Sequence, residues 1–332
     1  MTKKFDIAVL GAGPGGYVAA LRASQLKKRV VLIEKDKVGG VCMNYGCIPT
    51  KYLLYQVKEF MAVKKNKNLE GPLDKIKINW PQVQAGKRKV IARLVKGIEF
   101  LLQRNGVTLL RGTGSFLNDK QIMVQRDKEE VKVEAEKIIL ATGSQAAALP
   151  FLSANGQQII TSRQALELEV IPSKIIIVGA GAIGLEMGLI FHKIGSEVHI
   201  LEVMPTILPG SDKALTTRLE RFLRAQGLNI YTQMRIEESK TEGEKVVLKG
   251  SCLKDNKAFS FKAEKVLLAV GRKPNLDSFK NIKFSLDEKG FLKVNSFLET
   301  EVPGIFAIGD LIGGKLLAHK ASHQGLLAVE NA

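Results

Sequence analysis

One short glycine motif occurs twice in this 332-residue chain, 168 residues apart. The copies are Gly11-Ala-Gly13-Pro-Gly15-Gly16 and Gly179-Ala-Gly181-Ala-Ile183-Gly184, and each follows an apolar run. A helical pattern and a second apolar run come next. That run ends in an acid, Glu34 or Glu202, 23 residues after the first glycine. A strand, turn, helix and acid in this order are typical of dinucleotide binding, so the sequence predicts two dinucleotide sites.

The three glycines of each copy have separate steric reasons. The first permits the tight turn after the strand, the second lets a pyrophosphate approach the backbone, and the third lets the helix pack on the sheet. The pyrophosphate is expected at the helix N-terminus, where unpaired N–H groups favour an anion. The acid is expected to accept hydrogen bonds from ribose hydroxyls. Because Glu202 would repel a 2′-phosphate and the next arginine is Arg218, the second site is expected to prefer NAD over NADP.

Two of the three cysteines, Cys42 and Cys47, are separated by only four residues. They could be small buried hydrophobes, whereas a zinc site would need four ligands, and no second Cys or His pair of the chain has suitable spacing. A structural disulfide would suit a secreted chain, and no secretion signal precedes the first strand. A redox-active pair that opens and closes is therefore the favoured interpretation. Cys252 lies in a polar stretch and is interpreted as an ordinary cysteine.

These features together resemble the flavin-dependent pyridine nucleotide–disulfide oxidoreductases, and among them most closely the dihydrolipoamide dehydrogenases. The family implies an α/β fold with two Rossmann-like dinucleotide-binding domains, one for FAD and one for NAD, of a three-layer β-β-α type. Residues 1–146 are expected to form the FAD domain, 147–271 the NAD domain, and 272–332 a return segment that completes the FAD site. The matching segments are Gly11–Gly16, Gly39–Lys51, Ala141–Gly143, Gly179–Glu186, Val270–Asn275, Ile308–Asp310 and Leu317–Ala321.

The resemblance also implies which residues hold the cofactors. Lys51 is expected near the flavin N5 and paired with Glu186, and Asp310 on the ribityl chain. The helix that begins near Ala318 is expected to point its N-terminus at the flavin ring. The expected FAD contacts are Gly11, Gly13, Gly15, Gly16, Glu34, Lys51, Gly114 (against the adenine), Thr142, Gly143, Asp310 and Ala318. The expected NAD contacts are Gly179, Gly181, Ile183, Gly184, Glu202 and Gly271.

The implied catalytic residues are Cys42, Cys47, Lys51 and Glu186. Cys42 is expected to exchange with the substrate disulfide, and Cys47 to contact the flavin as a thiolate. The dithiol would reduce FAD, which exchanges a hydride with NAD. Dihydrolipoamide, free or bound to a 2-oxoacid dehydrogenase complex, is the expected substrate. The alternatives are another NAD(P)H-dependent disulfide reductase, for glutathione-like or metal-thiolate substrates, and a truncated FAD- and NAD-binding protein with diaphorase activity alone.

The resemblance departs from the family at the C-terminus. Relatives continue into an interface domain whose histidine–glutamate pair serves the cysteines of a partner subunit, and this domain is expected to be absent here. None of the four histidines, His192, His199, His319 and His323, matches that base, so lipoamide turnover is expected to be impaired. The family's homodimer is doubtful here, and some apolar surface is expected to stay uncovered. His319 and His323 stand four apart but make an incomplete metal site, so no metal is expected.

The net charge of +17 raises the question of an anionic partner. The lysines are dispersed and lack interleaved aromatic residues, so a solvated surface is favoured over nucleic-acid binding. Short clusters such as Lys27-Lys28-Arg29 and Lys87-Arg88-Lys89 are assigned to that surface. The most apolar stretch, Ile175–Phe191, contains motif glycines and Glu186, which argues against a membrane span. A cytoplasmic location is expected.

Overall fold

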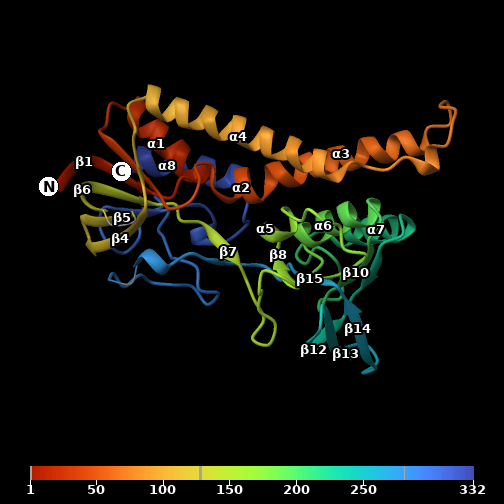
Figure 1. Cartoon of the computed structure of the whole chain (residues 1–332). Helices are drawn as coiled ribbons and strands as arrows, with labels where there is room; N and C mark the ends of the chain where they lie inside the picture. The colour runs from red at the N-terminus through yellow and green to blue at the C-terminus, as the bar shows by residue number, and fades with distance from the viewer. Residues whose placement is uncertain (1, 127–128, 280) are drawn as a thin grey trace. The chain divides into compact units, whose positions relative to one another are not determined.

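The computed structural model describes residues 2–126, 129–279 and 281–332, which fold into two compact α/β units (Figure 1). Unit 1 comprises Met1–Cys47, Val90–Gln145 and Lys273–Ala332, and unit 2 comprises Ile48–Lys89 and Ala146–Arg272. By their contacts, residues 48–89 belong to unit 2. Leu53, Val57, Trp80 and Val83 from that stretch are buried in the unit 2 core.

Unit 1 is built on a mixed sheet whose parallel part has the order β3-β2-β1-β6-β17. β6 also pairs antiparallel with β5, and β5 with β4, so a meander grows from the same sheet. Leu10 at the end of β1 lies opposite both Ile33 and Leu140. The carboxyl ends of these strands therefore meet at one edge, where open α/β sheets bind ligands. The strands are β1 (Thr2–Leu10), β2 (Val30–Glu34), β3 (Thr108–Arg111), β4 (Thr113–Asn118), β5 (Gln121–Arg126), β6 (Glu129–Leu140) and β17 (Ile305–Ala307).

Two helices of unit 1, α1 (Pro14–Gln25) and α8 (Ala318–Asn331), pack side by side. Helix α1 starts with a proline at its first turn, where the missing N–H costs nothing. Glycines bring the two backbones together, since a Cβ on Gly15 would lie 2.9 Å from the Ala321 carbonyl oxygen. Arg22, in the last turn of α1, forms an ion pair of 2.8 Å with Glu330 near the end of α8.

Unit 2 repeats the plan with a parallel sheet of order β11-β10-β9-β15-β8 and a separate antiparallel sheet of order β12-β13-β14. Helix α6 follows β9, as α1 follows β1, and the antiparallel strands extend downward in Figure 1. The strands are β8 (Ile159–Thr161), β9 (Lys174–Val178), β10 (Glu197–Leu201), β11 (Asn229–Tyr231), β12 (Met234–Glu242), β13 (Lys245–Cys252), β14 (Ala258–Ala263) and β15 (Lys265–Leu268). The helices are α5 (Ser162–Ala165), α6 (Ala182–Lys193) and α7 (Lys213–Ala225).

The apolar runs before the glycine motifs are strands buried on both faces. In β1, Ile7 and Val9 join the core cluster that contains the alanines of α1, whereas Ala8 and Leu10 join the cluster that contains the meander. Residues 175–178 of β9 alternate in the same way between the helix side and the antiparallel sheet. Side chains of a strand point to opposite faces in turn, so each unit has a helix layer, a parallel sheet and a meander. The expected α/β fold with two Rossmann-like β-β-α domains is confirmed.

The remaining elements are three helices, two short strands and three 3-10 turns among the described residues. α2 (Gly40–Tyr45) leads into the long helices α3 (Cys47–Lys65) and α4 (Trp80–Arg104), and the short strands β7 (Ser144–Ala146) and β16 (Arg272–Pro274) pair with each other. Short 3-10 turns occur at Leu73–Lys75, Asp277–Phe279 and Gly309–Ile312. Among the residues described, no helix is both long and apolar enough to cross a membrane.

The assignment of the whole Lys87-Arg88-Lys89 cluster to solvent is wrong. The side chain of Lys87 is fully buried in unit 2, where its ammonium group donates to the Leu166 carbonyl oxygen and pairs with Glu167. Gln84 donates to the same carbonyl at 3.2 Å. The helical spacing places Gln84 and Lys87 on the inner face of α4, and charge alone did not reveal this.

Candidate functional site

Of the three motif glycines in the unit 1 turn, only the middle one has space for a Cβ. Gly11 has φ = +98°, and a Cβ there would overlap the Ala141 carbonyl oxygen. A Cβ on Gly16 would overlap the Gly11 carbonyl oxygen, because α1 approaches the strand end closely. A Cβ on Gly13 would meet no atom within 4 Å. The middle glycine thus faces open space, as a closely approaching pyrophosphate requires.

The glycine turn of unit 2 excludes a Cβ at the equivalent positions. Gly179 has φ = +106° and excludes a Cβ through the Ala269 carbonyl oxygen, and Gly184 excludes one through the Gly179 carbonyl oxygen. Gly181 again meets nothing within 4 Å. Ile183, an expected NAD contact, packs partly buried against the unit 2 core.

Both helix N-termini are free to receive an anion. The N-cap residues of α1 and α6, Gly13 and Gly181, provide no side-chain cap, and neither first turn contains an acidic residue. Unpaired N–H groups and the helix dipole therefore point outward at each turn. These residues fit two dinucleotides, one in each unit.

The two acids occupy equivalent positions. Glu34 accepts hydrogen bonds from the Ala12 N–H at 2.6 Å and the Asp36 N–H at 2.8 Å. Glu202 accepts from the Ala180 N–H at 2.7 Å and the Met204 N–H at 2.9 Å. Each carboxylate thus fixes its own glycine turn, a structural task that the motif did not reveal. A carboxylate has about four acceptor positions, so two remain for ribose hydroxyls.

Burial raises the pKa of the Glu34 carboxyl above its usual range, and the backbone N–H groups of Ala12 and Asp36 oppose that shift. The two backbone N–H groups stabilise the ionised form of Glu34 and offset part of the cost of its burial. An ionised carboxylate can only accept hydrogen bonds, and sugar hydroxyls can donate them.

Cys42 and Cys47 form a disulfide with a Cα–Cα distance of 4.7 Å. This excludes the interpretation of two unlinked buried hydrophobes. Cys42 lies on α2, and Cys47 is the first residue of α3, where a helix dipole stabilises a thiolate. Asn44 holds the segment by donating to the Val38 and Gly40 carbonyl oxygens at 3.0 and 2.9 Å. Cys252 is free and half-buried on β13.

Lys51 stands one helical turn after Cys47 on α3, and its ammonium group forms an ion pair with Glu186 of α6. The pair is partly exposed and lies within unit 2. It ties the start of α3 to the helix that follows the second glycine turn.

Asn275 clamps the segment that contains Thr142 and Gly143, two expected FAD contacts. The Thr142 hydroxyl donates to the Asn275 carbonyl oxygen at 2.8 Å, and the Asn275 amide donates back to the Thr142 carbonyl oxygen at 2.9 Å. The Asn275 N–H also donates to the Gly143 carbonyl oxygen at 3.0 Å. The Ser144 hydroxyl donates to Asp310 at 2.5 Å. Asn275 lies at the end of a quoted motif and Ser144 directly follows another, but nothing in their local sequence indicated these partners.

Helix α8 begins at Ala318 with no side-chain cap, so its N-terminal N–H groups are available to an acceptor. Gln324 on the same helix accepts from the Gly309 N–H at 2.9 Å and steadies the turn that presents Asp310. Burial lowers the pKa of Lys320, and Asp310 opposes that shift. His319 and His323 are both exposed on α8, and the described residues contain no group of three or more potential metal ligands.

Gly114 and Gly15, two of the expected FAD contacts, are closely packed against protein atoms. A Cβ on Gly114 would lie 3.3 Å from side-chain atoms of Ile33 and Ile122, so this glycine serves packing between β4 and its neighbours. Gly15 serves the contact between α1 and α8 described above. Gly271, with φ = +118°, meets no atom within 4 Å of a Cβ and keeps an open backbone.

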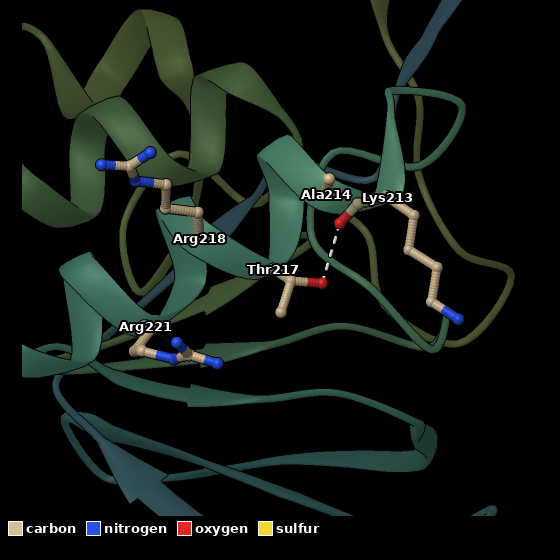
Figure 2. A pocket seen from close by; sticks show the side chains of 5 residues that line it. All are labelled: Lys213, Ala214, Thr217, Arg218 and Arg221. Carbon is tan, nitrogen blue, oxygen red and sulfur yellow. Dashed lines mark hydrogen bonds between the residues drawn. The ribbon is translucent and has the colours of Figure 1, made fainter.

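Two further features of unit 2 follow Glu202 in the sequence. Val203 and Met204, directly after Glu202, are 48% and 46% exposed apolar side chains. Figure 2 shows a shallow hollow on the outer face of α7, where Lys213, Arg218 and Arg221 spread apart. Every residue that lines this hollow comes from α7, so it contains none of the predicted cofactor residues.

The profile of the pyridine nucleotide-disulphide oxidoreductase family matches residues 5–325. The dihydrolipoyl dehydrogenase of Bacillus subtilis is 36% identical over 330 residues, which cover 98% of this chain and 71% of that protein. That of Acholeplasma laidlawii is 34% identical and covers 100% of this chain and 97% of that protein. The solved Cu(II) complex of the HOCl-induced flavoprotein disulfide reductase RclA from Escherichia coli superposes with a TM-score of 0.85 at 25% identity, over 98% of this chain and 70% of that one.

Proposed function

The chain belongs to the pyridine nucleotide-disulphide oxidoreductase family, a family of FAD enzymes that use NAD or NADP, and we propose that it exchanges electrons with dihydrolipoamide through Cys42 and Cys47. The observation that carries the proposal is the disulfide that ends at the first residue of α3. The names of the relatives support the lipoyl substrate. The protein-bound lipoyl arm of a 2-oxoacid dehydrogenase complex is the partner we propose.

The chemistry on the protein side is thiol–disulfide exchange. A substrate thiolate attacks the Cys42 sulfur, the Cys42–Cys47 bond breaks, and Cys47 leaves as a thiolate at the N-terminus of α3. The second substrate thiol then attacks the mixed disulfide, which yields oxidised substrate and two reduced cysteines. Lys51 adds positive charge one turn along α3, and Glu186 holds its ammonium group.

We propose that FAD occupies the unit 1 turn and NAD the unit 2 turn. Bound FAD would take up the two electrons of the dithiol and exchange them with the nicotinamide as a hydride. In unit 1, Glu34 would accept from the ribose hydroxyls and Asp310 from the ribityl chain. In unit 2, the Glu202 carboxylate would repel a 2′-phosphate, and the exposed Val203 and Met204 would pack against the adenine.

The test compares two electron acceptors for NADH, lipoamide and ferricyanide, in the purified FAD-loaded chain. We expect slow lipoamide reduction in the wild type, because no histidine of the chain matches the family's acid/base. We expect Cys47→Ser to lose it and to retain ferricyanide reduction, because one-electron acceptors need no thiol exchange. NADPH in place of NADH should be used far less well because of Glu202. Ferricyanide reduction without lipoamide reduction in the wild type would favour the alternative of an FAD- and NAD-binding protein with diaphorase activity alone, and lipoamide reduction by Cys47→Ser would contradict the thiol relay.

A further inference from the structure

Helix α4, which begins in unit 2 and ends in unit 1, carries a seam of regularly spaced residues that is buried over its first part and exposed further on. Trp80, Val83 and Lys87 recur at alternate steps of three and four residues and are buried in unit 2. The same spacing continues through Val90, Leu94, Gly97 and Leu101 in unit 1, where the side chains lie exposed. A 3.5-residue repeat is the pattern by which one helix packs along another.

The exposed half of this seam is not required by the core of unit 1. Ile98 and Leu102 on the neighbouring face are 8% and 1% exposed and anchor the helix there. Val90, Leu94 and Leu101 are instead 36%, 39% and 49% exposed. Gly97 lies within the continuous helix, at a position where a Cβ would meet no atom within 4 Å. A glycine inside a helix is less favourable than alanine, and it permits close approach of another backbone.

The charge around the seam selects one kind of partner. Helix α4 contains six Lys or Arg residues and one acid, Glu99, which already pairs with Arg111. Lys89, Arg93, Lys96 and Arg104 are exposed beside the seam. A second copy of the chain would set these cations against each other. A bilayer would favour a wider apolar face than a single seam with a glycine at its centre.

We propose that Val90, Leu94, Gly97 and Leu101 dock an amphipathic helix of a partner protein whose flanking positions are acidic. The apolar residues of that helix would fill the seam around Gly97, and its carboxylates would face Arg93 and Lys96. This surface lies outside the predicted cofactor residues, so it would recruit a partner without entering the redox site.

The probe is a fluorescent synthetic peptide of about four heptads with Leu at the seam positions and Glu beside them, and the comparison peptide carries Lys in place of Glu. Anisotropy with the purified chain should show saturable binding of the acidic peptide, weaker as salt rises, and no binding of the basic one. Leu94→Glu should weaken binding by about tenfold or more. Leu215→Glu, at a 69% exposed leucine on the basic helix α7, should leave binding unchanged.

Far-ultraviolet circular dichroism of each variant separates lost docking from lost folding, and Arg93→Glu supplies a second variant that keeps the apolar seam. Equal binding of the two peptides, or binding that Leu94→Glu leaves intact, would overturn the proposal. The proposal would also be overturned if sedimentation showed that the wild type dimerises and Leu94→Glu does not, because the seam would then bind a second copy of the chain. It would be overturned as well if the chain bound phosphatidylglycerol vesicles through the seam and did not bind the peptide, because the seam would then bind a membrane.

Discussion

Lys87 shows at the residue scale how a charged side chain can be taken wholly into the interior. Its methylene stem passes through the core of unit 2, and its ammonium group reaches the Leu166 carbonyl oxygen and Glu167. Burial lowers the pKa of Lys87, while the hydrogen bond and charge of Glu167 oppose that shift. The Glu167 side chain is 44% exposed, so the pair joins a buried ammonium group to a carboxylate at the surface and offsets the cost of burying the lysine.

We expect Lys87→Met to change the free energy of unfolding by no more than about 1 kcal/mol near pH 7, because methionine fills the space and Gln84 still donates to Leu166. The pH dependence should differ more. Between the lowered folded pKa and the ordinary value of 10.5, the unfolded wild type binds more protons than the folded one. The wild type should therefore gain stability relative to the variant as pH rises from about 7 to about 10.

Urea titrations at both pH values measure this difference, and Lys89→Met, at an exposed lysine of the same helix, is the control. If the stability of the wild type relative to Lys87→Met stayed constant as pH rises, Lys87 would have an ordinary pKa in the folded protein, and if it fell, the pKa would be raised; either result would contradict the prediction.

At the element scale, the strand–turn–helix unit is used twice with the same steric construction. The third glycine of each turn touches the carbonyl oxygen of the first, and only the middle glycine faces open space. The two units therefore offer a matched pair of substitutions at structurally equivalent residues. Overpacking at such a contact costs about 1–3 kcal/mol, and each 1.4 kcal/mol corresponds to tenfold in affinity.

We expect Gly16→Ala to release FAD and Gly184→Ala to weaken NADH binding by about tenfold or more while FAD is retained. The ratio of flavin to protein absorbance measures the first effect, and NADH titration of the purified protein measures the second. If both substitutions removed the same cofactor, or if Gly184→Ala released FAD and spared NADH binding, the assignment of one dinucleotide to each unit would fail.

At the scale of the whole molecule, the chain has a net charge of +17, and the dinucleotides that we propose as its ligands are anions. A strongly positive protein concentrates anions near its surface, and salt screens this effect over about 10 Å at 0.1 M. The charge thus favours the encounter with NADH, although the ion pairs on the surface add little stability.

We expect the KM for NADH to rise several-fold when NaCl is increased from about 20 to about 200 mM, because screening weakens the long-range attraction. The KM for lipoamide, an uncharged substrate, should stay nearly constant in the same steady-state experiment and serves as the internal control. A parallel rise of both values would indicate a general effect of salt on the enzyme, and a constant KM for NADH would mean that the net charge plays no part in its binding.

The sequence alone was sufficient for the two dinucleotide units and for the fold class. Their signals are local, because alternation buries a strand on both faces and steric exclusion reserves three positions for glycine. The strand, turn and helix of each unit lie within one short stretch of chain. Cys42 and Cys47 are equally local, since only four residues separate them.

Only the tertiary structure decided where residues 48–89 pack, which lysine of the 87–89 cluster is buried, and which groups hold the expected site residues. Asn275 reaches Thr142, and Asp310 reaches Ser144, across 133 and 166 residues of chain. Short-range periodicity carries no information about such pairs, because they depend on how strand ends and helix faces from separate segments come together. The sequence determined the elements and their glycine turns, and the packing of those elements decided which polar atoms meet, because buried donors and acceptors must find partners wherever the fold places them.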